Sequence, residues 1–254
     1  MTIAITREVS SRFNECELTH IERTPINVDV ARVQHREYVN ALVGVGCQMI
    51  ELPEEKDLPD SVFVEDIAFI LDEAAVITRP GADSRKPETE SIIRALSPHR
   101  ALVHVTAPAT VDGGDVLVLG KNIYVGLSTR SNSAAIEQLQ NLLDHYGYKV
   151  IGTEMTDCLH LKTAVTRVDD NTLLINTNWV SPDYFSGCDL IEVDPSEPFA
   201  ANCLPVNGQI IYPTSFPKTR AKLEAREYKI QAVTVDELAK AEGAVTCCSL
   251  IISQ

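Results

Sequence analysis

The sequence predicts an α/β fold in which five strand–helix–strand units close into a ring. Short apolar runs typical of buried strands alternate along the chain with stretches whose apolar residues recur at helical spacing. This alternation occurs five times, and a unit that repeats in this way needs neighbours to cover its apolar faces. We therefore expect a five-bladed, pseudo-symmetric α/β propeller with helices outside and strands lining a central channel.

The first two units lie in the N-terminal part of the chain. In the first, apolar residues at helical spacing in 33–42 precede a strand at 47–50. In the second, an apolar strand at 75–77 leads through a polar turn to a helical pattern at 92–96 and then to a strand at 101–105. Each unit thus changes between the helical spacing of apolar residues and the short apolar runs of strands, as alternating α and β elements require.

The third unit repeats the order, with a strand at 122–126, a helical pattern at 136–143 and a strand at 148–151. The fourth is a shortened copy, because only a short segment separates the strands at 173–176 and 190–193. We therefore expect its helix to have shrunk.

The fifth unit runs from a strand at 209–212, through a helix around Leu223, to a strand at 230–233. No Pro-, Gly- or Ser-rich linker and no block of like charge interrupts the chain, so we expect a single domain over 1–254. Polar residues at the strand-to-helix turns of such a ring would converge on one mouth.

The charge balance restricts the class of partner. Twenty-two basic and 36 acidic residues give a net charge of −14, which argues against nucleic acid, whose phosphates require a basic surface. It favours attraction of small cations, although an acidic surface also serves solubility. A homodimer remains one option for the oligomeric state.

Compartment and membrane association follow from apolar runs and cysteines. No run approaches the roughly 20 apolar residues needed to cross a bilayer, and the N-terminal stretch lacks the apolar core of a signal peptide. Seven scattered cysteines without a Cys-x-x-Cys pair fit reduced thiols better than disulfides or structural zinc. We therefore expect a cytoplasmic protein without a membrane partner or a metal.

Two adjacent thiols near the C-terminus, Cys247 and Cys248, precede the apolar strand 250–252. On a strand, neighbouring side chains point to opposite faces, so only one thiol would face the channel, and spacing does not decide which. The alternative is that both are small core residues, as free cysteines usually are.

Two upstream motifs supply candidate partners for a reactive thiol. His160 lies between two leucines on a segment we expect to be extended, which would direct its imidazole to the face opposite them. Asp112-Gly113-Gly114-Asp115 is either a simple turn or a place where the glycines allow a ligand to approach the backbone. A hydrogen-bonded structural histidine is the alternative for His160.

Charged residues elsewhere suggest a ligand with two charged ends. Asp60, Glu65 and Asp66 place three carboxylates around an apolar run, where they either mark a solvated edge or hold a planar guanidinium. Arg85 and Arg130 occupy matching turns in their units, as ordinary surface residues or as a pair that binds a carboxylate. Arginine has both features.

Seven segments together resemble dimethylarginine dimethylaminohydrolases, in the family's order and over nearly the whole chain. They are residues 60–66, 77–85, 112–115, 124–130, 159–162, 201–203 and 246–249. The resemblance implies a guanidine-modifying enzyme with the five-bladed α/β propeller of the pentein type. It thus agrees with the fold that the repeats predict.

The resemblance also implies catalytic roles. Cys247 would be the nucleophile, with Cys248 its outward neighbour; His160 would be the general acid and base, and Asp112 the acidic residue beside it. The implied reaction hydrolyses a methylated arginine, without a cofactor, to citrulline and methylamine or dimethylamine. The thiolate attacks the guanidinium carbon, and a thiouronium intermediate is then hydrolysed.

Further positions correspond to the family's substrate-binding residues. The guanidinium would lie against Glu65 and Asp66, the substrate carboxylate against Arg85 and Arg130, and the amino-acid end near Asp60. Backbone carbonyls near Leu18 and Ala241 would bind the α-amino group. Family members often have a larger aliphatic residue near 241 and Asp at the position of Glu242, so the lip of the site differs here.

Other functions stay open at this point. Arginine deimination and amidino transfer use the same thiol, histidine and carboxylates, and differ in the room around the leaving nitrogen. A non-catalytic arginine sensor or a zinc or redox switch built on the two thiols belongs to another class of protein.

Overall fold

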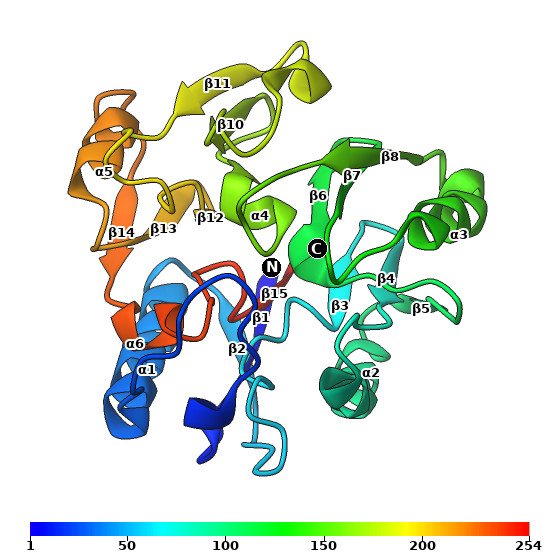
Figure 1. Ribbon diagram of the computed structural model, residues 1–254, viewed down its shortest axis with the longest axis horizontal. Helices are drawn as coiled ribbons and strands as arrows, with labels where there is room; N and C mark the ends of the chain where they lie inside the picture. Colours follow the sequence, from blue (N-terminus) through cyan, green and yellow to red (C-terminus); the bar gives the residue numbers. More distant parts are fainter. Residues whose placement is uncertain (254) are drawn as a thin grey trace.

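Five three-stranded sheets stand around a central axis in the computed structural model, which describes residues 1–253 (Figure 1). The larger helices lie on the outside of the ring, and the sheets radiate from its centre. The five strand–helix–strand repeats in the sequence therefore correspond to five blades. This confirms the predicted five-bladed α/β propeller.

One strand pattern recurs in every blade. In the second blade, β3 (Ala68–Ile70) pairs antiparallel with β4 (Ala74–Ile77), which pairs parallel with β5 (Ala101–His104). A parallel neighbour requires a crossover connection, and η2 (Asp83–Glu88) and α2 (Thr89–Leu96) provide it here. The third blade repeats this with β6 (Val116–Leu119), β7 (Asn122–Leu127), α3 (Ser133–Leu143) with η4 (Asp144–Tyr146), and β8 (Lys149–Glu154).

The fourth and fifth blades follow the same order. The fourth consists of β9 (Val165–Arg167), β10 (Thr172–Ile175) and β11 (Asp189–Glu192), with only the 3₁₀ turn η5 (Pro182–Phe185) as its crossover. The expected shrinkage of this helix is confirmed. The fifth consists of β12 (Leu204–Val206), β13 (Gln209–Pro213), α5 (Pro217–Glu224) and β14 (Ile230–Val233).

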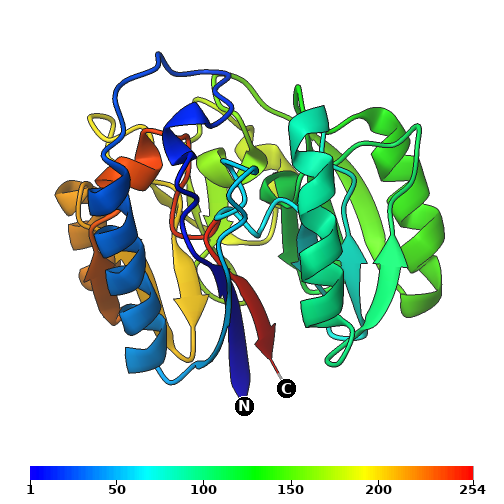
Figure 2. The same ribbon diagram turned by 90° about the horizontal axis from the view of Figure 1, so that it is seen from below.

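The first blade is built from both ends of the chain. β1 (Thr2–Arg7) crosses through η1 (Phe13–Glu15) and α1 (Val28–Gly44) to its parallel neighbour β2 (Gln48–Leu52). Its antiparallel neighbour is the last strand, β15 (Leu250–Ser253), which closes the ring (Figure 2). This pairing fixes the turn that precedes β15, because the turn leads directly into a paired strand.

Each outer helix buries one stripe against its sheet. In α3, Ala135, Leu139 and Leu143 recur every four residues and are fully buried, and the Asn132 side chain caps the first turn. In α1, the Asn27 side chain caps the first turn in the same way. Within residues 1–253, every helix is too short or too polar to span a bilayer.

Candidate active site

Cys247 and Cys248 lie on a tight turn that leads from α6 (Asp236–Ala239) to β15, at the centre of the ring. The expectation that they alternate on a strand is wrong, because β15 begins only at Leu250. Hydrogen bonds fix the turn: the Cys247 N–H donates to the Ala244 carbonyl (3.2 Å), and the Cys247 carbonyl accepts the N–H of Glu65 (3.1 Å). Cys247 is 8% exposed and lines the central cavities, whereas Cys248 is fully buried among core side chains.

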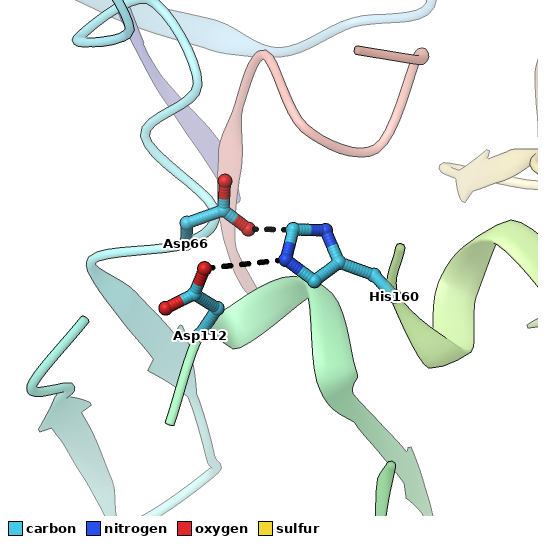
Figure 3. A group of neighbouring side chains, drawn as sticks. All are labelled: Asp66, Asp112 and His160. Atoms are coloured by element: carbon cyan, nitrogen blue, oxygen red, sulfur yellow. Dashed lines mark hydrogen bonds and ion pairs between the residues drawn. The ribbon is translucent and has the colours of Figure 1, made fainter. Parts of the chain in front are cut away.

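His160 is the residue that precedes the short helix α4 (Leu161–Ala164), so the expected extended segment ends at the histidine itself. Its Nε2 lies 3.2 Å from Oδ2 of Asp112, and its Nδ1 lies 3.9 Å from Oδ1 of Asp66 (Figure 3). Burial alone lowers the pKa of His160, but the carboxylates of Asp66, Asp112 and Asp115 outweigh it and raise the pKa to about 9. The imidazole is therefore a cation at neutral pH.

Asp66, Asp112 and His160 present three ligand atoms within 4.8 Å of one another, which is close enough to hold a metal ion. These groups already have partners within the protein, however. Asp66 forms an ion pair with the buried Arg85, and its Oδ1 accepts the N–H of Gly114 (3.1 Å). His160 and Arg85 hold the pKa of Asp66 below its usual range although burial opposes this. The donors thus form a histidine–carboxylate–arginine network.

The Asp112–Asp115 motif forms the 3₁₀ turn η3 (Gly113–Asp115), whose glycines make room for neighbouring protein groups, and Gly114 also lines a central cavity. A Cβ atom at Gly113 would lie 1.9 Å from the Glu65 carbonyl oxygen. A Cβ atom at Gly114 would lie 2.6 Å from Nδ1 of His160. Gly113 therefore permits close packing of η3 against the backbone at Glu65, and Gly114 permits the close approach of His160 to Asp66.

Asp115 positions the segment that carries the histidine, a role that the sequence analysis missed. Its Oδ1 accepts the N–H of Leu161 (3.0 Å), and its Oδ2 accepts the hydroxyls of Ser128 and Ser131 (both 2.6 Å). Burial raises the pKa of Asp115 to about 6, although the nearby imidazole and the two hydroxyls oppose the rise. The sequence did offer a signal for this role: Asp115 is the second aspartate of the 112–115 motif, of which only Asp112 was predicted as a site residue.

Glu65 is held by partners that the sequence analysis also missed. Its Oε1 forms an ion pair with Nζ of Lys162 (2.6 Å), and its Oε2 accepts the Thr246 hydroxyl (2.7 Å). Thr246 in turn exchanges hydrogen bonds with the side chain of Asn202 (2.9 and 3.1 Å). Lys162, Asn202 and Thr246 lie within the motifs at 159–162, 201–203 and 246–249. The spacing of these motifs along the chain gives no indication that the three residues meet.

Arg85 is buried at the centre of a network that occupies most of its N–H donors. It pairs with Asp66 and Glu88 and donates to the backbone carbonyls of Asp60 (3.2 Å) and Phe63 (3.0 Å). A guanidinium has five N–H donors. The bonds to these four residues leave one N–H on Nη1 without a partner within the described residues.

Two cavities meet at Cys247 and His160. The smaller, about 20 Å³, is lined by Asp60, Asp66, Arg85, Arg130 and Ala241. The larger, about 230 Å³, extends toward the fourth and fifth blades. Five residues line both: Leu159, His160, Glu242, Gly243 and Cys247. Leu18 lines neither cavity and packs, partly buried, against the hydrophobic core that includes Cys247 and Cys248.

Residues 17–23, which follow Cys16, form a roof over both cavities. Glu17 lines the smaller cavity and donates its N–H to Asp60 (3.1 Å), while His20 and Ile21 line the larger. The N–H groups of Thr19 and His20 both donate to the Glu242 carboxylate (2.7 Å each). Glu242 therefore holds the roof to the turn that carries Cys247.

Comparisons with known proteins identify the family. A family model described as N,N dimethylarginine dimethylhydrolase, eukaryotic, matches residues 5–181. A dimethylarginine dimethylaminohydrolase of Streptomyces coelicolor is 36% identical over 249 residues, which cover 97% of this chain and 95% of the relative. The chain belongs to the dimethylarginine dimethylaminohydrolase family.

Solved structures of dimethylarginine dimethylaminohydrolases have the same fold. The Pseudomonas aeruginosa enzyme, described as a cysteine-to-serine mutant complexed with citrulline, superposes with a TM-score of 0.94 at 33% identity over 98% of both chains. A second, described as a histidine-to-glycine adduct with S-methyl-L-thiocitrulline, gives 0.93 at 32% identity over 99% of this chain and 100% of the other.

The surroundings of Cys247 in this dimethylarginine dimethylaminohydrolase family member favour the neutral thiol over the thiolate. Burial, followed by the carboxylates of Glu65 and Asp66, raises the pKa of Cys247 well above that of an ordinary thiol. The nucleophilic form of cysteine is the thiolate. A cation bound beside these two carboxylates would offset their effect and favour that form.

Proposed function

We propose that this protein hydrolyses Nω-methylated arginine to citrulline and methylamine or dimethylamine, with Cys247 as the nucleophile. The observation that carries the proposal is the meeting of Cys247 and the His160–Asp112 pair at the junction of a charged cavity and an apolar one. The citrulline complex of the Pseudomonas relative and the thiocitrulline adduct support the same chemistry.

The smaller cavity suits the amino-acid end of the substrate. Arg130 and the remaining Nη1 donor of Arg85 would bind the α-carboxylate, and Asp60 lies beside them. The Ala241 carbonyl is a candidate acceptor for the α-amino group, because Ala241 lines this cavity. Leu18 is a weaker candidate, because only its neighbour Glu17 lines the cavity.

The guanidinium would then lie at the junction, against Glu65 and Asp66. Binding of this cation lowers the pKa of Cys247, and the thiol loses its proton to solvent. The thiolate attacks the guanidinium carbon and a C–S bond forms. His160, which is protonated at neutral pH, gives its proton to the methylated nitrogen; the C–N bond breaks and the neutral amine leaves.

Water completes the cycle. Neutral His160 takes a proton from water, whose oxygen attacks the thiouronium carbon. The C–S bond breaks, the hydroxyl proton returns to sulfur, and citrulline leaves. Asp112 keeps the imidazole oriented and supports its protonated form throughout. The carboxylates beside the thiol thus serve twice, by binding the substrate cation and by keeping the thiol neutral until it arrives.

An amine-release assay with arginine, monomethylarginine and dimethylarginine tests the proposal. Release of methylamine and dimethylamine with stoichiometric citrulline, at rates well above ammonia release from arginine, is the expected result. The apolar wall of the larger cavity favours methylated over bare nitrogen, because methyl groups leave water when they enter it. Ammonia release from arginine as the dominant reaction would make the protein a deiminase instead.

A further inference from the structure

The larger cavity provides much more room than two methyl groups need. Its volume is about 230 Å³, whereas one water molecule occupies about 30 Å³ of liquid and a methyl group is of similar size. Beyond the junction with the smaller cavity, its walls come from the fourth and fifth blades. These walls include Phe199, Pro213, Phe216, Val235 and Ala239.

Most polar groups near its inner end are already paired. Lys162 and Glu65 form an ion pair, the amide of Asn202 is bonded to Thr246, and the Glu242 carboxylate holds two N–H groups of the roof. The chamber therefore offers mainly hydrocarbon surface to an occupant, so a polar occupant would lose hydrogen bonds to water on entering.

The outer end of the chamber reaches the molecular surface. Phe199 is 46% exposed, and Ala239 at the end of α6 is also exposed. A group attached to the leaving nitrogen can therefore extend outward along the apolar wall from Cys247. Its length is not limited by a closed end.

We propose that this chamber binds substituents larger than methyl on the leaving nitrogen, so that the protein also hydrolyses Nω-alkyl- and Nω-arylalkylarginines. This inference rests on the proposed function and deepens it. The bonds that form and break are the same as for methylarginine. One water molecule is consumed, the bond between the guanidinium carbon and the substituted nitrogen is hydrolysed, and the products are citrulline and the free alkylamine or benzylamine.

The test compares Nω-methyl-, Nω-butyl- and Nω-benzylarginine with Nω-(3-hydroxypropyl)arginine, which matches the butyl compound in length. For the wild type, kcat/KM for the butyl and benzyl compounds should lie within about tenfold of the methyl value. The hydroxypropyl compound should be poorer than the butyl compound by about tenfold, because its hydroxyl loses hydrogen bonds to water in the apolar chamber.

A variant that narrows the chamber identifies where the substituent lies. Ala239→Leu should reduce kcat/KM for the butyl and benzyl compounds by about tenfold or more and change that for methylarginine less than about threefold. Ala225→Leu is the matched control, because Ala225 is also exposed but does not line the chamber. It should change neither value.

The outcomes separate this inference from the proposed function. Methylamine release without butylamine or benzylamine release, or equal loss of all activities in Ala239→Leu, overturns the inference and leaves the proposed function standing. Equal rates for butyl and hydroxypropyl compounds also overturn it, because the chamber would then not act as an apolar site. Absence of methylamine release overturns the proposed function itself.

Discussion

At the scale of single residues, the packing around His160 depends on the absence of a side chain at Gly114. The amide of Gly114 donates to Asp66, and its Cα lies against the imidazole ring. A methyl group there would meet Nδ1 of His160 at 2.6 Å and Oδ1 of Asp66 at 2.8 Å. The proposed catalytic geometry therefore requires glycine at position 114, because any side chain there would overlap His160 and Asp66.

Gly114→Ala should displace the imidazole and reduce kcat at least 100-fold, because small misplacement of a reacting group is costly. The fold should survive, since the displaced side chain borders a cavity. Steady-state kinetics with monomethylarginine and circular dichroism would measure the two effects. Near-normal kcat in a folded variant would mean that the histidine does not need this position.

The two thiols should respond differently to replacement by serine. Cys247→Ser should abolish amine release and leave the free energy of unfolding nearly unchanged, since Cys247 borders the cavities. Cys248→Ser should retain substantial activity but lose about 1–3 kcal/mol of stability, because a hydroxyl enters a fully buried position. Active-site assays and urea unfolding distinguish them; the reverse pattern would make Cys248 the nucleophile.

The protonation of His160 should link stability to pH. Its pKa of about 9 in the folded protein lies above the ordinary 6.5, so the imidazolium stabilises the fold. This contribution, on the order of 3 kcal/mol, is fully present below about pH 6.5 and is lost as the pH rises through 9. Urea unfolding of wild type and His160→Gln should show a difference that narrows between pH 6.5 and 9.5. A difference that widens over that range would contradict the assignment.

At the scale of elements, the roof segment and the turn after α6 form one unit through Glu242. Its carboxylate accepts two backbone N–H groups, and hydrogen bonds to a charged acceptor are stronger than neutral ones. Arg23 adds bonds from the roof to the carbonyls of Asn14 (2.8 Å) and Cys16 (2.5 Å). Opening the roof would require breaking the two bonds to Glu242 and also the bonds of Glu17 and Thr19 to Asp60, Ser84 and Arg130.

Glu242→Gln should loosen the roof, because an amide offers one acceptor oxygen in place of two. We expect KM for methylarginine to rise about tenfold with a smaller change in kcat. Trypsin should also cleave faster after Arg23, which is exposed. Glu242→Asp, which keeps the charge, is the control. Its KM and its rate of cleavage should lie between those of the wild type and those of Glu242→Gln. Unchanged KM and cleavage in Glu242→Gln would show that the roof is held elsewhere.

Helices and strands whose apolar residues recur regularly along the whole element could be predicted from the sequence, whereas the contacts made within turns could not. The helical spacing in 136–143 and the apolar run in 122–126 predicted α3 and β7, because burial of one face imposes a period. The prediction of an extended segment around His160 is wrong only beyond the histidine: the backbone at His160 is extended, but it turns into α4 at Leu161, because two leucines around a histidine resemble a strand without fixing where it ends.

The same limit applies to the candidate site. Sequence motifs selected residues that do line the two cavities, such as Asp60, Asp66 and Arg130. They did not indicate that Arg85 is bound within the protein by two carboxylates, or that Lys162 and Thr246 hold Glu65. Such pairings join distant segments, and their partners depend on how the blades are arranged.

At the scale of the whole molecule, the ring depends on β15. Removal of residues 250–254 keeps Cys247 in the chain but removes the antiparallel neighbour of β1. This truncation should abolish amine release and cooperative unfolding together, because the buried Leu250 and Ile252 belong to the core.

A circular permutant is the matched test of ring closure. A short linker from residue 253 to residue 2 is feasible, because Thr2 pairs with Ser253. New ends at the exposed turn between Gly120 and Lys121 leave every blade intact. The permutant should keep most of the activity that the truncation loses, and an inactive but folded permutant would contradict this account.

The position of β15 after all the other described strands also has a consequence for biosynthesis. A ribosome releases the N-terminal blades first, but the first blade lacks its third strand until residues 250–253 emerge. The turn with Cys247 acquires its hydrogen bond from the Glu65 N–H only when this strand docks. A nascent chain that stops before residue 250 therefore lacks the strand that anchors this turn, and the proposed thiol site can assemble only after β15 has been synthesised and has paired with β1.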